Sequence, residues 1–271
     1  MLVVMALFAL TGLNSCHKSQ SDSDKETQTS ADNATAEVLF NDVFNQVALF
    51  SGSNSLFKIR AAVCDTSWLN QDSAFPRTMT IAYRGNNCVD TYGVGRTGSM
   101  LASFSNLFKD SLAVVKVSFN GYSVSNYKIA GIYLLTNTGH NSAGHLVYTM
   151  QVTGDTTGQS AVITTPSGKT ILWSAQHSLE WVQGDTSSTF TNPVLQITGT
   201  ARGFGQLGTP FTETITTALK FAFPCRWPES GVATISPGNL TPRTDTFGSG
   251  GSCVSKVNVS FSNQNYTETM P

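Results

Sequence analysis

Few side chains in this sequence have the type and spacing that catalysis or metal binding requires. Five cysteines are spread over the chain, and none forms the C-x-x-C pair that is typical of zinc sites. Cys64, Cys88, Cys225 and Cys253 form an even set, which in an oxidising compartment predicts two disulfides. Of the three possible pairings we favour Cys64–Cys88 and Cys225–Cys253, because each closes a short loop and would contribute about 3 kcal/mol by constraining the unfolded chain. We therefore interpret these cysteines as structural.

The histidines and carboxylates show no spacing that would assemble a catalytic group. His140 and His145 are five residues apart, which matches no helix face, and His177 lies near Glu180. We expect all three histidines to be solvated. A glycosidase needs two carboxyl groups within about 5–10 Å, and the candidates in this sequence are Asp155, Glu180, Asp185 and Glu213. Nothing in their spacing favours such a pair, so we expect no catalytic residues, no metal site and no cofactor.

Tryptophan side chains are the remaining candidates for ligand binding, because the flat apolar face of an indole suits a sugar ring. The candidates are Trp68, Trp173, Trp181 and Trp227. Trp68 lies in a loop-like stretch and is the one that we most expect to be exposed. For the other three we favour a place in the core, with sugar stacking as the alternative.

The N-terminus has the pattern of a leader with a lipid attachment site. The first fifteen residues carry no charge, and residues 2–10 form an apolar run. That run is typical of a signal peptide and is shorter than the roughly 20 residues of a membrane-spanning helix. It is followed by Leu13-Asn14-Ser15-Cys16, which resembles the lipobox of bacterial lipoproteins. The resemblance implies cleavage before Cys16 and a diacylglycerol on its thiol; the alternative is an ordinary signal peptide with an incidental cysteine.

The next segment, residues 17–37, carries seven charged side chains and almost no large apolar one. Such a composition buries too little apolar surface to fold, so it predicts a flexible tether between the lipid and a domain. The expected organisation is a signal peptide at 1–15, a tether at 16–37 and a β-rich domain at 38–271.

The elements of that domain follow from hydrophobic periodicity. Residues 35–51 carry apolar side chains at helical spacing and predict the one helix. Apolar and polar residues then alternate with period two in several segments, as in residues 79–83, 115–119, 146–152 and 257–261. One apolar face and one face rich in serine and threonine, which together number 65, are typical of an antiparallel sheet with a wet side.

Turn residues complete the prediction of the fold. Asn120-Gly121 is a strong signal for a hairpin turn, and Pro166-Ser167-Gly168 predicts a second one. Roughly a dozen strands are expected, so the fold class is all-β: an antiparallel meander with one N-terminal helix, arranged as a sandwich, half-barrel or elongated twisted sheet. A weak echo between residues 80–89 and 244–254 leaves open whether the domain contains two similar halves.

Several short motifs resemble a family of uncharacterised Bacteroidota lipoproteins. They lie at residues 79–83, 87–88, 92–98, 168–174, 180–182, 225–227 and 230–231. The resemblance covers most of the chain from about residue 57 onward, and it departs at Ala82 and Arg84, where an acidic residue and glycine are more usual. The family has no assigned activity, so the resemblance implies a location and a fold.

Charge and location together define the expected function. With 16 basic and 17 acidic residues, the chain lacks the dense basic surface of a nucleic-acid-binding protein. We expect an outer-membrane lipoprotein, on the periplasmic side or at the cell surface, held in the membrane by the lipid on Cys16. Its role would be non-catalytic binding or scaffolding, with a glycan or an envelope protein as partner. The alternatives are a structural subunit of a surface fibre or complex and a hydrolase acting on glycans.

Overall fold

The computed structural model describes residues 24–51, 65–69, 74–90, 92–156, 158–184, 193–249 and 251–271, with only the backbone for 65–69, 86, 87 and 249. In chain order the elements are α1 (Gln28–Ser51), β1 (Asp65–Leu69), β2 (Arg77–Val89), β3 (Gly95–Phe104), β4 (Val114–Val124), β5 (Tyr127–Ala130), β6 (Ile132–His140), β7 (Leu146–Thr153), β8 (Ala161–Thr164), β9 (Thr170–Gln183), β10 (Val194–Phe204), β11 (Pro210–Ala222), β12 (Ser230–Pro237), β13 (Arg243–Ser249), β14 (Ser252–Phe261) and β15 (Gln264–Thr269).

All fifteen strands belong to one antiparallel sheet, which confirms the predicted all-β meander. Most strands pair with their neighbours in the chain, so the sheet grows in sequence order from β1 to β15. It branches in the middle, where β4 pairs with both β5 and β6, and β9 pairs with β7, β8 and β10. The described strands therefore form one curved sheet rather than the two stacked sheets of a sandwich. Residues 80–89 and 244–254, whose sequences are weakly similar, both belong to this one sheet.

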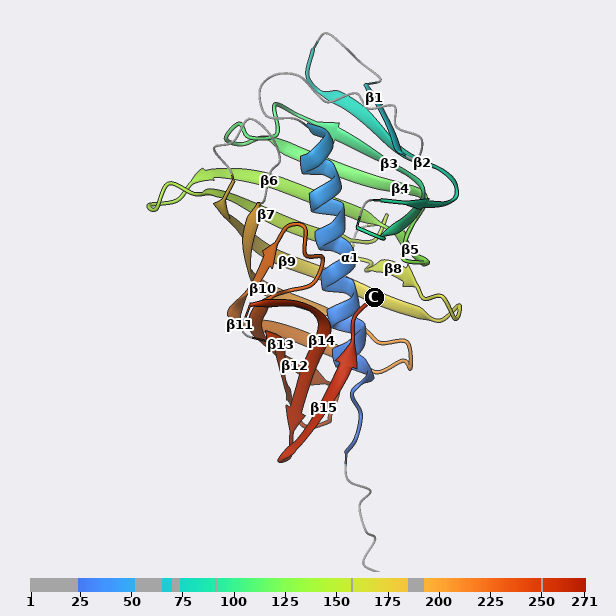
Figure 1. The fold of residues 1–271 in the computed structure, drawn as a ribbon, viewed down its shortest axis with the longest axis vertical. Coiled ribbons are helices and arrows are strands. Elements are labelled where there is room, and N and C mark those ends of the chain that lie inside the picture. The colour runs from blue at the N-terminus through green and yellow to red at the C-terminus, as the bar shows by residue number, and fades with distance from the viewer. Residues whose placement is uncertain are drawn as a thin grey trace, which may run out of the picture.

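Helix α1 runs across the strands on the inner side of the sheet (Figure 1). Nearly all of its residues are buried, including polar ones on every face. The helix contacts β9, β11, β12, β14 and β15, so strands from the second half of the chain cover it. Among the described helices, none has the length and the apolar composition that crossing a membrane requires.

The helix begins at Gln28, seven residues before its predicted start at residue 35. The prediction of a flexible tether is therefore wrong for residues 28–37, while residues 16–23 lie outside the described part of the chain. The physical reason is that several polar side chains of residues 28–37 find hydrogen-bonding partners in the strands and turns that cover the helix. Ser30 and Asn33, for example, both donate to carboxylates of distant strands, and a buried polar group with a partner does not oppose folding.

The predicted turn at Asn120-Gly121 is wrong, because both residues lie within β4. Gly121 (φ 58°) lies against Gly98 of β3 (φ 75°), where the register of the two strands shifts. A Cβ on Gly98 would lie 2.2 Å from the carbonyl oxygen of Gly121, so the pair forms a β-bulge that only glycine permits. The turn that follows β4 uses Ser125 and Asn126, both with positive φ. The predicted turn at residues 166–168 is confirmed between β8 and β9.

Candidate functional site

The cysteines form disulfides where the structure describes them. Cys225 and Cys253 are bonded, with 5.6 Å between their Cα atoms, which confirms that pairing. Cys88 is also disulfide-bonded. Its expected partner Cys64 lies outside the described residues, so this second pairing stays a prediction, as does the lipid on Cys16.

The tryptophans proposed for sugar stacking divide into three groups. Trp173 and Trp181 are 0% and 1% exposed and pack against Phe40 and Phe44 of α1. The ligand-binding hypothesis is therefore wrong for these two residues, because a sugar cannot reach a ring inside the core. Trp227 is partly buried and donates its indole N–H to the Pro271 carbonyl. Trp68 lies in β1, paired with Thr80, and not in the predicted loop; its side chain lies outside the described residues.

The histidines differ from one another in burial. His140 is exposed, and His145 lies 2.7 Å from Glu180 in a pair that is about one-third exposed. Hydrogen bonds from His145 and Asn141 lower the pKa of Glu180. The expectation of a solvated side chain is wrong for His177, which is 2% exposed. It occupies an inward-facing position of β9, where side chains alternate between the core and solvent.

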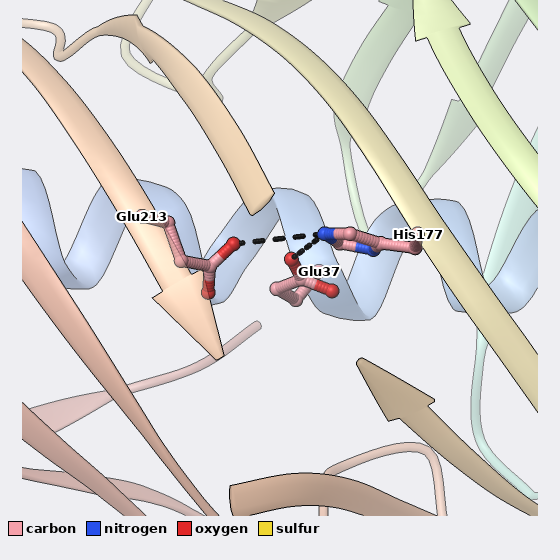
Figure 2. Close-up of side chains that lie close together, drawn as sticks. All are labelled: Glu37, His177 and Glu213. Atoms are coloured by element: carbon pink, nitrogen blue, oxygen red, sulfur yellow. Dashed lines mark ion pairs between the residues drawn. The ribbon is translucent and has the colours of Figure 1, made fainter. Parts of the chain in front are cut away.

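His177 meets two glutamates inside the protein, one from the helix and one from the sheet (Figure 2). Its Nε2 lies 3.5 Å from Oε1 of Glu37 on α1 and 3.7 Å from Oε2 of Glu213 on β11. One donor atom from each residue lies within 4.8 Å of the others. All three side chains are at most 2% exposed. We call these three residues the Glu-His-Glu cluster.

The cluster contains polar atoms that lack hydrogen-bonding partners among the described residues. Oε1 of Glu37, Oε2 of Glu213 and both ring nitrogens of His177 are buried and unpartnered. Burial, together with the nearby carboxylate of Glu213, raises the pKa of Glu37 well above its ordinary value. Two buried carboxylates this close require a proton or a cation between them.

The remaining oxygen of Glu213 is held in place by a chain of hydrogen bonds. Asn33 of α1 donates from Nδ2 to Oε1 of Glu213 over 2.7 Å. Trp173 donates its indole N–H to Oδ1 of Asn33 over 2.9 Å. These contacts fix the orientation of the carboxylate and direct its unpartnered Oε2 towards His177.

The position of His177 also depends on a glycine in the neighbouring strand. Gly199 of β10 pairs with His177 and has φ 134°. A Cβ at Gly199 would lie 2.8 Å from Cα of His177 and 2.9 Å from its Cδ2. The absence of a side chain there lets the two strands bring His177 to the cluster.

Two further groups of charged residues lie along α1. Near its N-terminal end, Arg243 of β13 donates to the carboxylate of Asp24 and the carbonyl oxygen of Glu26, while Ser30 donates to Asp245. In the second half of the helix, Asp42 accepts hydrogen bonds from Arg96 of β3 and from the hydroxyl of Tyr122. These contacts join the helix to both the early and the late strands of the sheet.

A groove of about 590 Å³ crosses the sheet where β7, β9, β10 and β11 lie side by side. Its exposed lining consists mainly of hydroxyl and amide side chains, with the guanidinium of Arg202 among them. The polar side chains that the groove presents include Gln151, Gln176, Thr200, Thr212 and Thr214. Sequence alternation assigned such residues to the wet face, but could not show which strands would be neighbours.

Neither sequence-based alternative for function finds support in the described residues. The structure brings Glu213 beside Glu37, and both are too deeply buried for a polysaccharide to reach. Of the other glycosidase candidates, Asp155 is exposed, Glu180 pairs with His145, and Asp185 lies outside the described residues. The strands at the two ends of the sheet have only five and six residues in the described part, which gives little edge for fibre assembly.

Comparison with known proteins assigns a role to neither the groove nor the cluster. No protein-family model, no curated protein and no solved structure matches the chain.

Proposed function

We propose that the protein is a lipid-anchored binding module of the outer envelope, and that the groove across β7, β9, β10 and β11 binds a glycan. The observation that carries the proposal is the two-dimensional array of hydroxyl and amide groups in this groove. Each of these groups can both donate and accept hydrogen bonds, which suits a ligand that is covered with hydroxyls. Arg202 adds a positive charge and favours a glycan that carries carboxylate or sulfate groups.

The test replaces groove side chains by groups of the same shape. Thr212→Val/Thr214→Val removes two hydroxyls from β11, and Arg202→Gln removes the charge from β10. We expect the mature protein to bind an acidic glycan on an array, and the triple variant to bind at least about tenfold more weakly. Tenfold corresponds to about 1.4 kcal/mol, which is within reach of two or three lost hydrogen bonds.

The matched control is Thr244→Val/Thr246→Val on β13, where both threonines are exposed and neither lines the groove. This pair should leave binding unchanged. If the control weakens binding as much as the triple variant does, or if the wild-type protein binds no glycan, the groove is not a glycan site.

The lipid anchor rests on the lipobox-like sequence that ends at Cys16. It is supported by exposed apolar side chains at the end of the molecule where the chain enters the fold. Leu207 (61% exposed) and Leu240 (40% exposed) lie in two loops. The backbone N–H of Gln206, next to Leu207, donates to Asp32, and Arg243, at the start of the strand that follows the second loop, donates to the carbonyl oxygen of Glu26. Such side chains suit a surface that faces lipid headgroups.

Metabolic labelling with palmitate tests the anchor. We expect the wild-type protein to incorporate the label and to partition with membranes, and Cys16→Ala to lose both properties. Labelling that persists in Cys16→Ala, or its absence from the wild type, would show that Cys16 carries no lipid.

A further inference from the structure

We infer that the Glu-His-Glu cluster is a metal site, in which Glu37, His177 and Glu213 bind one divalent transition-metal ion such as Zn²⁺ inside the protein. The ion would tie α1 to β9 and β11. The three side chains come from three separate elements and point at one another (Figure 2). Glu213 also belongs to the lining of the groove, between Thr212 and Thr214, but its side chain is fully buried. The metal site does not depend on whether the groove binds a glycan.

The donor set is chemically suitable. Imidazole nitrogen and carboxylate oxygen are both zinc ligands, with metal–ligand distances of about 2.0–2.2 Å. Donor atoms at the corners of such a tetrahedron are about 3.3–3.6 Å apart. In the cluster, Nε2 of His177 lies 3.5 Å and 3.7 Å from the two glutamate oxygens. These two separations are already close to those that a bound ion would impose, and the two glutamate oxygens lie within 4.8 Å of each other.

Charge and hydrogen bonding favour a cation at this position. The atoms that face one another are Oε1 of Glu37, Oε2 of Glu213 and Nε2 of His177, and all three are buried without a hydrogen-bonding partner among the described residues. A buried acceptor without a donor destabilises the fold, and an unpaired buried charge destabilises it more. A divalent cation would satisfy all three atoms and would neutralise both carboxylates.

The surroundings of Glu213 have the arrangement that orients a metal ligand. Asn33 donates to Oε1 of this carboxylate and is itself fixed by the indole of Trp173, so that Oε2 stays free. Groups that hold the second atom of a ligand in this way are typical of metal sites. Asn41, one helical turn after Glu37, adds a further buried oxygen without a hydrogen-bonding partner among the described residues.

The competing explanation is a shared proton. Glu37 would then be protonated and hydrogen-bonded to Glu213, and no ion would be needed. Replacing Glu37 by glutamine distinguishes a metal site from a shared proton. Glutamine resembles a protonated glutamate in shape and hydrogen bonding, but it is a poor zinc ligand.

The experiment uses the full-length mature protein, purified without a polyhistidine tag. After exposure to Zn²⁺ and removal of the excess, we expect elemental analysis to find about one zinc ion per chain. Stripping the ion with a chelator should lower the melting temperature by roughly 5–15 °C, and Zn²⁺ should restore it. Glu37→Gln should bind no zinc, and its melting temperature should respond to neither zinc nor the chelator.

Glu180→Gln is the matched control, because it removes a carboxylate from the exposed His145–Glu180 pair. It should retain both the zinc and the response to the chelator. The inference is overturned if the wild-type protein holds no zinc and its melting temperature is insensitive to chelator and zinc. It is equally overturned if Glu37→Gln binds zinc as the wild type does, or if Glu180→Gln loses the ion.

Discussion

Arg96→Met is expected to lower the free energy of unfolding by about 3–5 kcal/mol, because it leaves a buried carboxylate without its counter-ion. Arg96 is 4% exposed and donates to both carboxylate oxygens of Asp42. It also donates to Asp90 over 2.7 Å. Methionine keeps much of the apolar stem but cannot satisfy Asp42, whose only other hydrogen-bond donor among the side-chain contacts of the described residues is Tyr122. Denaturant-induced unfolding at neutral pH measures the loss.

Lys220→Met provides the control for this prediction. The Lys220–Glu229 pair has a similar separation, 3.2 Å, but the lysine side chain is 40% exposed. Because water screens such a pair, its loss should cost only about 0–1 kcal/mol. If the two variants lose the same free energy of unfolding, burial does not make the Arg96–Asp42 pair more important for stability than an exposed pair.

Asp245→Asn is expected to stabilise the protein by about 4 kcal/mol at about pH 8, and to have little effect near pH 4. Asp245 is fully buried and accepts a hydrogen bond from Ser30, while its second oxygen has no hydrogen-bonding partner among the described residues. Burial, reinforced by the nearby charge of Glu213, raises its pKa from 3.8 to about 7. Asparagine reproduces the neutral side chain at every pH.

The direction of this effect follows from the protons bound in each state. Between about pH 4 and pH 7 the folded protein keeps a proton on Asp245 that the unfolded chain releases. The stability contributed by this group is therefore complete below pH 4 and is lost as the pH rises through 7. The difference between wild type and variant should grow over that range in a series of unfolding curves. Asp155→Asn, at an exposed position, should show no such trend. A constant difference at all pH values would show that Asp245 is not protonated in the folded state.

The regular parts of the fold could be predicted because their signals are local. Period-two alternation identified strands such as β7 and β14, where the alternating apolar residues at 146, 148, 150 and 152 and at 257, 259 and 261 are buried. The Cys225–Cys253 disulfide could also be predicted from the sequence, because its two cysteines are only 28 residues apart. The burial of His177 could also have been predicted from the sequence. It shares the parity of Trp173 and Trp181 along one strand, and a polar residue at such a position is a sign of an internal site.

The start of α1 could not be predicted, because its causes lie far away in the sequence. Ser30 is 215 residues from Asp245, and Asn33 is 180 residues from Glu213. Without those partners, the charged composition of residues 17–37 does indicate an unfolded segment. The prediction of a turn at Asn120-Gly121 was wrong for a related reason. The local preference of these residues for a turn is overridden by the close approach of Gly98 in β3.

The position of α1 inside the sheet also determines the order in which the molecule can be completed. The helix is the first described element to be synthesised, whereas Arg243 and Asp245 belong to one of the last strands. Contacts between such distant parts of a chain are slow to form, because a long loop must close before they contribute stability. Ser30 of the helix therefore lacks its partner Asp245 until β13 has been synthesised. A protein that must cross a membrane before folding would gain from such a delay.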